Sequence, residues 1–288
     1  ALRYHRRWAA GRTELYPTVQ TRCALLQSVG SILGYLTSLL TAVLPFRAYY
    51  LIDVGLSGLR SLAAGSLREP VVTETQAARE AAETRALLAT LPRRLRAHVR
   101  ETVRFLLGSP ATTRLIFANA VISLPCYLTL MFLQQRLSAA GLPTALLGLI
   151  VCLFELGRPV GSWLSLRVRP RRLVGLYAAC AALGGLCTVA AGLAPLPLAV
   201  LAGAGFAGCE MLWTLCSERR LNDSFPSDQR ATLVSVNSMV YSLLMVPVSP
   251  LTGLAGDLTG APGAGLALLG GGVLAAGIAA RCWAKRPH

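Results

Sequence analysis

Residues 93–133 read RRLRAHVRETVRFLLGSPATTRLIFANAVISLPCYLTLMFL, a basic segment that passes directly into an apolar run. Five arginines stand before Gly108, whereas 115–133 contains no charged residue. A helix that crosses a hydrocarbon core about 30 Å thick needs about 20 mostly apolar residues, and 115–133 is close to that length. The same alternation of basic and apolar segments recurs along the chain. We therefore expect a protein that crosses a membrane several times.

Eight apolar runs of this kind predict an all-α membrane protein with eight transmembrane helices. The predicted spans are 23–44, 46–66, 115–133, 144–166, 173–194, 196–216, 231–251 and 264–280. Only 14% of the residues are charged, and the mean hydropathy is +0.54. The runs are too uniformly apolar for the one-sided stripe of a soluble helix. They also lack the ten-residue alternation that is typical of membrane barrels.

The basic residues are concentrated between the spans, on one side. Of the 28 lysines and arginines, 24 fall in the segments 1–22, 67–114, 167–172, 217–230 and 281–288. Only Arg136 lies in the loops of the opposite side, and three arginines lie within spans. Because basic flanking residues stay in the cytoplasm, both termini are predicted to be cytoplasmic, in a plasma membrane. The same bias explains the net charge of +15, so we expect anionic lipid rather than nucleic acid as the partner.

The spacing of the spans predicts three parts of the chain. Residues 1–66 form a cytoplasmic lead-in with two spans, 67–114 a basic cytoplasmic linker, and 115–288 a unit of six spans. In the linker, apolar residues recur at helical spacing. They are Leu95, Val99, Val103 and Leu106. This pattern fits a helix lying on the membrane surface, and a solvated linker helix is the alternative.

The order of two spans, a basic linker and six spans resembles the major facilitator superfamily with its first four helices absent. Three local patterns carry the resemblance: GSWLSLRVRPRR at 161–172, PSDQRATLVS at 226–235 and PLTGLAGDLTG at 250–260. In the first, Ser165, Leu166 and Val168 replace the Asp, Arg and second Gly of the family's loop motif. The eight spans would then correspond to helices five to twelve of that fold.

The resemblance implies a secondary transporter that moves a small organic solute by alternating access. Together with the carboxylates in the spans, it indicates H⁺-coupled export of a drug or metabolite from a bacterial cell. The expected partners are the solute, H⁺, the lipid bilayer and, if the chain is a fragment, the missing N-terminal helices of the same protein. A truncated remnant that does not transport is the alternative.

Two charged residues lie close together in the fourth predicted span. Glu155 is near its middle, and Arg158 follows three residues later on the same side of a helix. One interpretation is a self-satisfied pair that fixes helix packing near the cytoplasmic gate. The other is a carboxylate that takes up and releases H⁺, tuned by burial and by the arginine. The sequence leaves both open.

Glu210 lies in the sixth predicted span and has no cation within one helical turn. Either another helix supplies a cation, or the carboxyl group is neutral. An ionisable residue at the bilayer centre costs at least about 2.5 kcal/mol, which favours a functional role. Glu155, Arg158, Glu210 and the polar Asn119 are therefore candidates for proton coupling or solute binding.

The second predicted span carries further charged residues. Asp53 has Arg47 six residues before it and Arg60 seven residues after it, within reach only through extended side chains. In a complete transporter this span would belong to the other half. Asp53 and Arg60 are therefore additional candidates for residues that face a central cavity.

A cytoplasmic gate is predicted where the loops of the six-span unit meet. Arg171 or Arg172 could pair with Glu218 or Asp223, next to Gly161 of the loop pattern. The positive-inside bias alone would also place these arginines there.

Small residues and prolines predict how the spans pack. Gly30 with Gly34, Gly157 with Gly161, and the segment 203–208 have the spacing that lets helices approach closely. The segment 203–208 also matches a dinucleotide-binding fingerprint, but no strand precedes it. Bends are expected at Pro125, Pro159, Pro247 and Pro250.

A polytopic membrane enzyme, such as a lipid-linked transferase, is the remaining class. Such chemistry would need paired aspartates, a histidine or a metal cluster near the interface. The eight cysteines are scattered, mostly within spans, and the three histidines lie outside the spans. No metal-ligand spacing results, so the sequence predicts no metal, no cofactor and no enzyme activity.

Overall fold

The computed structural model describes residues 16–42, 44–66, 96, 100, 104, 107–168, 173–224, 230–261 and 263–284. These residues form helices joined by short turns, with no strand among them, which confirms the all-α prediction. The apolar face predicted for the linker helix lies outside the described residues. On its basic face, Arg96, Arg100 and Arg104 are helical and exposed.

All eight predicted spans fall on helices. The elements are α2 (Tyr16–Leu36), η2 (Thr37–Ala42), α3 (Phe46–Gly65), α7 (Pro110–Ala139), α8 (Thr144–Glu155), α9 (Gly157–Arg167), α10 (Leu173–Leu193), α11 (Leu196–Ser224), α12 (Arg230–Thr259) and α13 (Ala264–Ala284). The fourth predicted span is interrupted at Leu156, between α8 and α9. Within the described chain, six helices are long and apolar enough to cross a membrane, with α8 and α9 together forming one of them. The other two predicted spans, on the α2–η2 pair and on α3, are helical but are not among these six.

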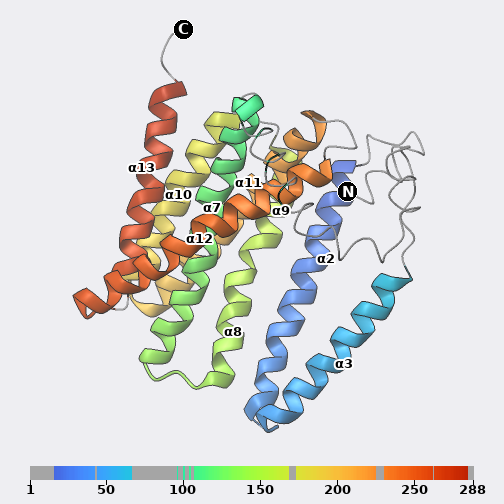
Figure 1. The fold of residues 1–288 in the computed structure, drawn as a ribbon. Helices are drawn as coiled ribbons and strands as arrows, with labels where there is room; N and C mark the ends of the chain where they lie inside the picture. Colours follow the sequence, from blue (N-terminus) through green and yellow to red (C-terminus); the bar gives the residue numbers. More distant parts are fainter. Residues whose placement is uncertain are drawn as a thin grey trace.

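The helices run alternately up and down through the bundle. α7 and α10 begin at one end of the bundle, and α9, α11 and α13 end there (Figure 1). We call it the basic end because the arginine-rich segments flank these helix ends in the sequence. α2 packs along α8 and α9, whereas α3 lies at the edge and contacts mainly η2. α12 crosses the bundle obliquely and packs on α7 and α13.

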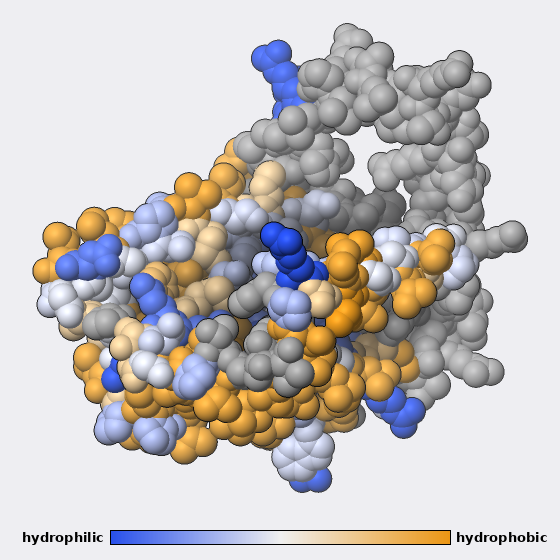
Figure 2. All heavy atoms as spheres, turned by 90° about the horizontal axis from the view of Figure 1, so that it is seen from below, coloured by the Kyte–Doolittle hydropathy of each residue, from blue (hydrophilic) through white to orange (hydrophobic). Residues whose placement is uncertain are grey.

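The core of the bundle is formed by α7, α8, α10 and α11. Its largest fully buried side chains include Ile122, Phe154, Phe206 and Trp213. Trp213 packs edge-on against Tyr177, with ring centroids 5.3 Å apart, so it is a packing residue rather than an interfacial one. On the outside, many large hydrophobic side chains remain exposed, and they form much of the described surface in Figure 2. This distribution fits a protein whose solvent is lipid.

A seam of small residues joins α10 to α13. Gly192 lies against Gly263, Gly185 against Gly270, and Ala178 against Gly277. Each helix uses every seventh residue, and the order reverses because the helices are antiparallel. A Cβ atom on Gly185 would lie 2.7 Å from the carbonyl oxygen of Gly270, so no side chain fits there. The sequence analysis did not identify this seam.

Arg136 has a structural role that explains its exceptional position. It lies at the end of α7 opposite the basic end, and its Nη1 and Nη2 atoms donate to the carbonyl oxygens of Ala191 and Ala194 at 2.7 and 2.6 Å. These carbonyls belong to the C-terminal end of α10, where cations are favoured. Arg136, expected in a loop, therefore lies in the last turn of α7 and caps the neighbouring α10.

The seam predicts that Gly270 and Gly272 respond differently to the same substitution. Gly270→Val forces α10 and α13 apart and should lower the free energy of unfolding by about 1–3 kcal/mol. Gly272→Val, two residues away with no described atom near its Cβ position, should leave stability within about 0.5 kcal/mol of the wild type. Unfolding in detergent micelles measures both. Equal effects would contradict the seam.

Candidate functional site

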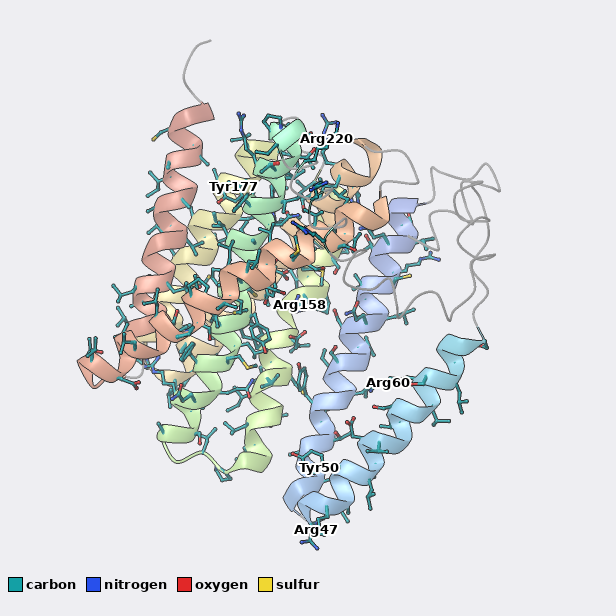
Figure 3. The ribbon with its side chains drawn as sticks, viewed as in Figure 1. Arg47, Tyr50, Arg60, Arg158, Tyr177 and Arg220 are labelled. Atoms are coloured by element: carbon teal, nitrogen blue, oxygen red, sulfur yellow. The ribbon has the colours of Figure 1, made fainter. Side chains whose placement is uncertain are left out.

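The centre of the bundle holds a guanidinium group between two carboxylates. The Nε atom of Arg158 lies 3.0 Å from Oε2 of Glu155, and its Nη1 atom lies 2.7 Å from Oε2 of Glu210. Glu155 is only 5% exposed and Glu210 only 7% exposed. Figure 3 places Arg158 in the middle of the helices, away from the bundle ends. We call Glu155, Arg158 and Glu210 the charged cluster.

The charged cluster coincides with the break between α8 and α9. α8 ends at Glu155, Leu156 is a turn residue, and α9 begins at Gly157. Proline has no N–H, so Pro159 cannot donate to the carbonyl of Glu155 four residues before it. The predicted bend at Pro159 is thus an interruption of the helix. Broken helices whose ends meet at the middle of a bundle form ion and substrate sites in membrane transporters.

The predicted contact between Glu155 and Arg158 is present, although the helix is interrupted between them. For Glu210, the structure decides between the two alternatives: a cation comes from another helix, 52 residues away in sequence. Glu210 is therefore not a lone carboxylate. Glu155 and Arg158 are likewise not a self-contained pair, because the same guanidinium binds both acids.

Hydroxyl groups complete the environment of Glu210. Its Oε1 atom accepts hydrogen bonds from Ser123 of α7 and from Thr214 of α11, both at 3.1 Å. The sequence analysis missed both residues. Thr214 is four residues after Glu210 and Ser123 four residues after Asn119, so helical spacing from the candidate residues could have indicated them.

Asn119 extends the polar face of α7 toward α12. Its Nδ2 atom donates to Oδ1 of Asn237 at 3.2 Å. The Oδ1 atom of Asn119 is buried and accepts no hydrogen bond from the described residues. Because a buried acceptor normally has a partner, this atom is available to a water molecule or a solute. Asn119 and Ser123 lie one helical turn apart, which links this acceptor to the charged cluster.

Close packing of α9 on α11 brings the charges together. Gly157 lies against the backbone of Ala204, and Gly161 against the backbone of Gly208. Gly161, predicted as part of a gate, is therefore a packing residue here, as its spacing from Gly157 also indicated. The similar prediction for Gly30 and Gly34 is wrong, because no described atom lies within 4 Å of a Cβ position on either glycine.

A second polar group joins α2, α9 and α11 at the basic end. Arg219 of α11 donates to the carbonyl oxygen and the hydroxyl of Ser165 at 2.9 and 3.0 Å, and to the hydroxyl of Thr21 at 3.1 Å. Gln20 of α2 accepts from Arg219 at 3.4 Å and donates to Glu218 at 2.8 Å. We call Gln20, Thr21, Ser165, Glu218 and Arg219 the basic-end latch.

The latch shares Glu218 with the predicted gate. Within the described residues Glu218 accepts a hydrogen bond from Gln20 of α2, and its predicted pairing with Arg171 or Arg172 stays a prediction. Arg171 and Arg172 lie outside the described residues, as does the side chain of Asp223. The sequence analysis missed Arg219, because a basic residue at this end was attributed to topology alone.

Asp53 and Arg60 are not brought to the charged cluster. Both side chains are exposed on α3, and Figure 3 shows Arg47 and Arg60 on this edge helix, well away from Arg158. No ion pair joins Asp53 to either arginine in the described chain. The prediction that they face a common cavity with the other candidates remains untested.

The helical fold and the buried charged cluster together define a multi-pass membrane protein. The model of the Major Facilitator Superfamily matches residues 16–222. Since this is well over half of the 288 residues, the chain belongs to that superfamily, whose members are membrane transporters. Neither a curated protein nor a solved structure matches the chain. The predicted family is thus confirmed.

The charged cluster predicts a non-additive double-mutant cycle. Arg158→Gln leaves two buried carboxylates without their cation and should lower the free energy of unfolding by about 3–5 kcal/mol. Adding Glu210→Gln removes one orphaned charge, so the double variant should be more stable than the sum of the single changes predicts. Unfolding in detergent micelles provides the readout. Arg60→Gln, an exposed arginine within a helix, is the control, and a loss as large as that of Arg158→Gln would contradict the assignment.

The latch predicts a local change in α2 when Arg219 is lost. Hydrogen bonds to a charged group contribute about 1.5–3 kcal/mol each, so Arg219→Gln should speed amide hydrogen exchange at 16–24 by at least about tenfold. Mass-spectrometric hydrogen exchange of the full chain in nanodiscs measures this. Arg281→Gln at the end of α13 should leave these amides unchanged. Unchanged exchange in Arg219→Gln would show that the latch does not hold α2.

Proposed function

We propose that the chain transports a small organic solute by alternating access and that H⁺ drives its export as a drug or metabolite. The observation that carries the proposal is the pair of buried carboxylates sharing Arg158. With both acids ionised, the charged cluster has a net charge of −1, so one proton would make it neutral. Intramembrane ionisable residues of this kind mark proton and solute pathways in transporters.

A proton on either carboxylate would weaken that carboxylate's contact with Arg158. Glu155 ends α8, Arg158 lies in α9, and Glu210 lies in α11, so the contact to Glu210 joins two membrane-spanning elements. Its strength would depend on the proton occupancy of the cluster. Proton binding would thereby bias the relative position of α9 and α11, which is the differential interaction that a coupled conformational change requires.

The basic-end latch would provide the closed state of one gate. It ties α2 to α9 and α11 through hydrogen bonds. Opening this end to the cytoplasm would break the contacts of Arg219 with Thr21 and Gln20. The positive-inside bias supports a cytoplasmic location for this end and for both termini in a plasma membrane.

The orphaned acceptor on Asn119 would contribute to the solute site. It lies one turn from Ser123, which contacts Glu210, so solute and proton would share neighbouring groups. Antiport by this arrangement needs no chemical change in the solute, which is why we propose transport and no enzyme activity.

The proton hypothesis predicts that Glu210→Gln abolishes coupling. In inverted membrane vesicles with an imposed pH gradient, adding a transported solute from a panel of organic cations and neutral drugs should dissipate the gradient. Glu210→Gln should reduce this flux by at least about tenfold, equivalent to about 1.4 kcal/mol. Asp257→Asn, at an exposed carboxylate near the end of α12, is the matched control and should retain flux.

The same vesicles separate coupling from transport itself. Solute flux that is equal with and without a pH gradient would overturn proton coupling while leaving transport intact. If the protein is folded and stable but moves no solute of the panel, this result would instead count against transport by this chain.

A further inference from the structure

An apolar groove lies between α8–α9, α10 and α11. Its volume is about 540 Å³, within the range of about 300–1,000 Å³ that is typical of small-molecule sites. Leucines, Val160 and Val200 form most of its walls, and Ala204, Gly205 and Gly208 of α11 form its floor. The floor consists of small residues because α9 and α11 approach so closely that larger side chains do not fit between them.

The groove is on the opposite side of both helices from the charged cluster. Along α8 and α9 it is lined by Leu156, Val160 and Leu164, whereas Glu155 and Arg158 lie about half a turn away at 100° per residue. On α11 the same geometry separates Gly208 from Glu210. The groove is therefore distinct from the proposed proton and solute site.

The rim of the groove faces outward, where lipid would be. Val160 is 60% exposed, Leu183 54% and Leu201 67%. These side chains belong to three different helices that are long and apolar enough to cross a membrane. An opening with such a rim can be entered from the hydrocarbon of the bilayer, without passage through water.

Arg167 is the last residue of α9, beyond the end of the groove that is nearest the basic end. Arg167 follows Leu164 by three residues and so continues the same side of α9. Its guanidinium carbon lies 4.0 Å from the ring centroid of Trp163, the residue before Leu164 of the groove wall, which fixes the side chain near this end of α9. Among the described residues, Arg167 has no hydrogen bond or ion pair, so its N–H groups remain available to an anion.

We propose that this groove binds an anionic phospholipid, with one acyl chain in the groove and the phosphate at Arg167. The apolar walls match the chain, and the cation at one end matches the headgroup, at the depth where the helix leaves the membrane. Arginine at the cytoplasmic surface attracts anionic lipid, and Trp163 is the type of side chain that lies at headgroup level. The occupant is therefore a lipid of the inner leaflet rather than the transported solute.

Quenching of Trp163 by brominated lipid tests the proposal. The full chain with Trp8→Phe and Trp283→Phe is placed in nanodiscs of phosphatidylcholine containing increasing fractions of acyl-brominated phosphatidylglycerol. Trp163, the residue before Leu164 of the groove wall, then reports lipid near the basic end of the groove, whereas Trp213 is buried in the core. Half-maximal quenching should need about fivefold less brominated phosphatidylglycerol than brominated phosphatidylcholine. Arg167→Gln should remove this preference, and Arg167→Lys should retain most of it.

Matched substitutions separate a specific site from general lipid contact. Ala179→Leu fills the groove from the wall of α10 without adding a tryptophan, and it should reduce quenching of Trp163 by both lipids. Ala279→Leu, at an exposed alanine on α13, and Arg281→Gln, at the end of the same helix, should behave like the wild type. If Ala179→Leu lowers thermal stability, Ala179→Val replaces it.

Three results would overturn the proposal. Equal quenching by the two lipids in the wild type would exclude recognition of the anionic headgroup. A loss of preference in Arg281→Gln equal to that in Arg167→Gln would mean general attraction to a basic surface. Unchanged quenching in the groove-filled variant would mean that the acyl chain does not enter the groove.

Discussion

The bonds of Arg158 to Glu155 and Glu210 are the interaction on which the centre of this bundle depends. Buried charges are tolerated in a membrane only when they are paired, and removing one partner leaves the other uncompensated. One guanidinium serves two acids from different helices, so the position of α11 relative to α9 is tied to an electrostatic requirement. The 2.7 Å contact is possible because Gly161 and Gly208 let the two backbones approach.

This close approach gives α9 and α11 two contrasting sides. One side carries the charged cluster and leads through Ser123 to the buried acceptor on Asn119. The other side forms the floor and one wall of the apolar groove, and Arg167 follows on the same side of α9. Any movement of α9 against α11 must change both sides at once. The proposed proton site and the proposed lipid site would therefore be mechanically linked through the same pair of helices.

The sequence predicted the helical elements and the contacts within a helix better than the contacts between helices. The close-packing glycine Gly161 follows from helical spacing, which is the same in any helix. The pair Glu155 and Arg158 follows from it too, because Leu156 at the break keeps a helical backbone conformation. Gly30 has an equivalent spacing to Gly34, yet no described helix packs there. The seam of Gly185 and Gly270 was missed, although its sevenfold spacing is visible in both helices, because nothing local indicates which helices pair.

The sequence by itself determined the membrane class, the helical fold, the family and the end of the bundle at which basic residues collect. These properties depend on the length of apolar runs and on the positions of charges, and both are local. Only the tertiary structure decided that Arg158 serves Glu210, that Arg219 joins α2 to α9, and that Arg136 caps α10. These partners lie on different helices, each pair more than fifty residues apart, and only the packing of one backbone against another brings them within hydrogen-bond distance.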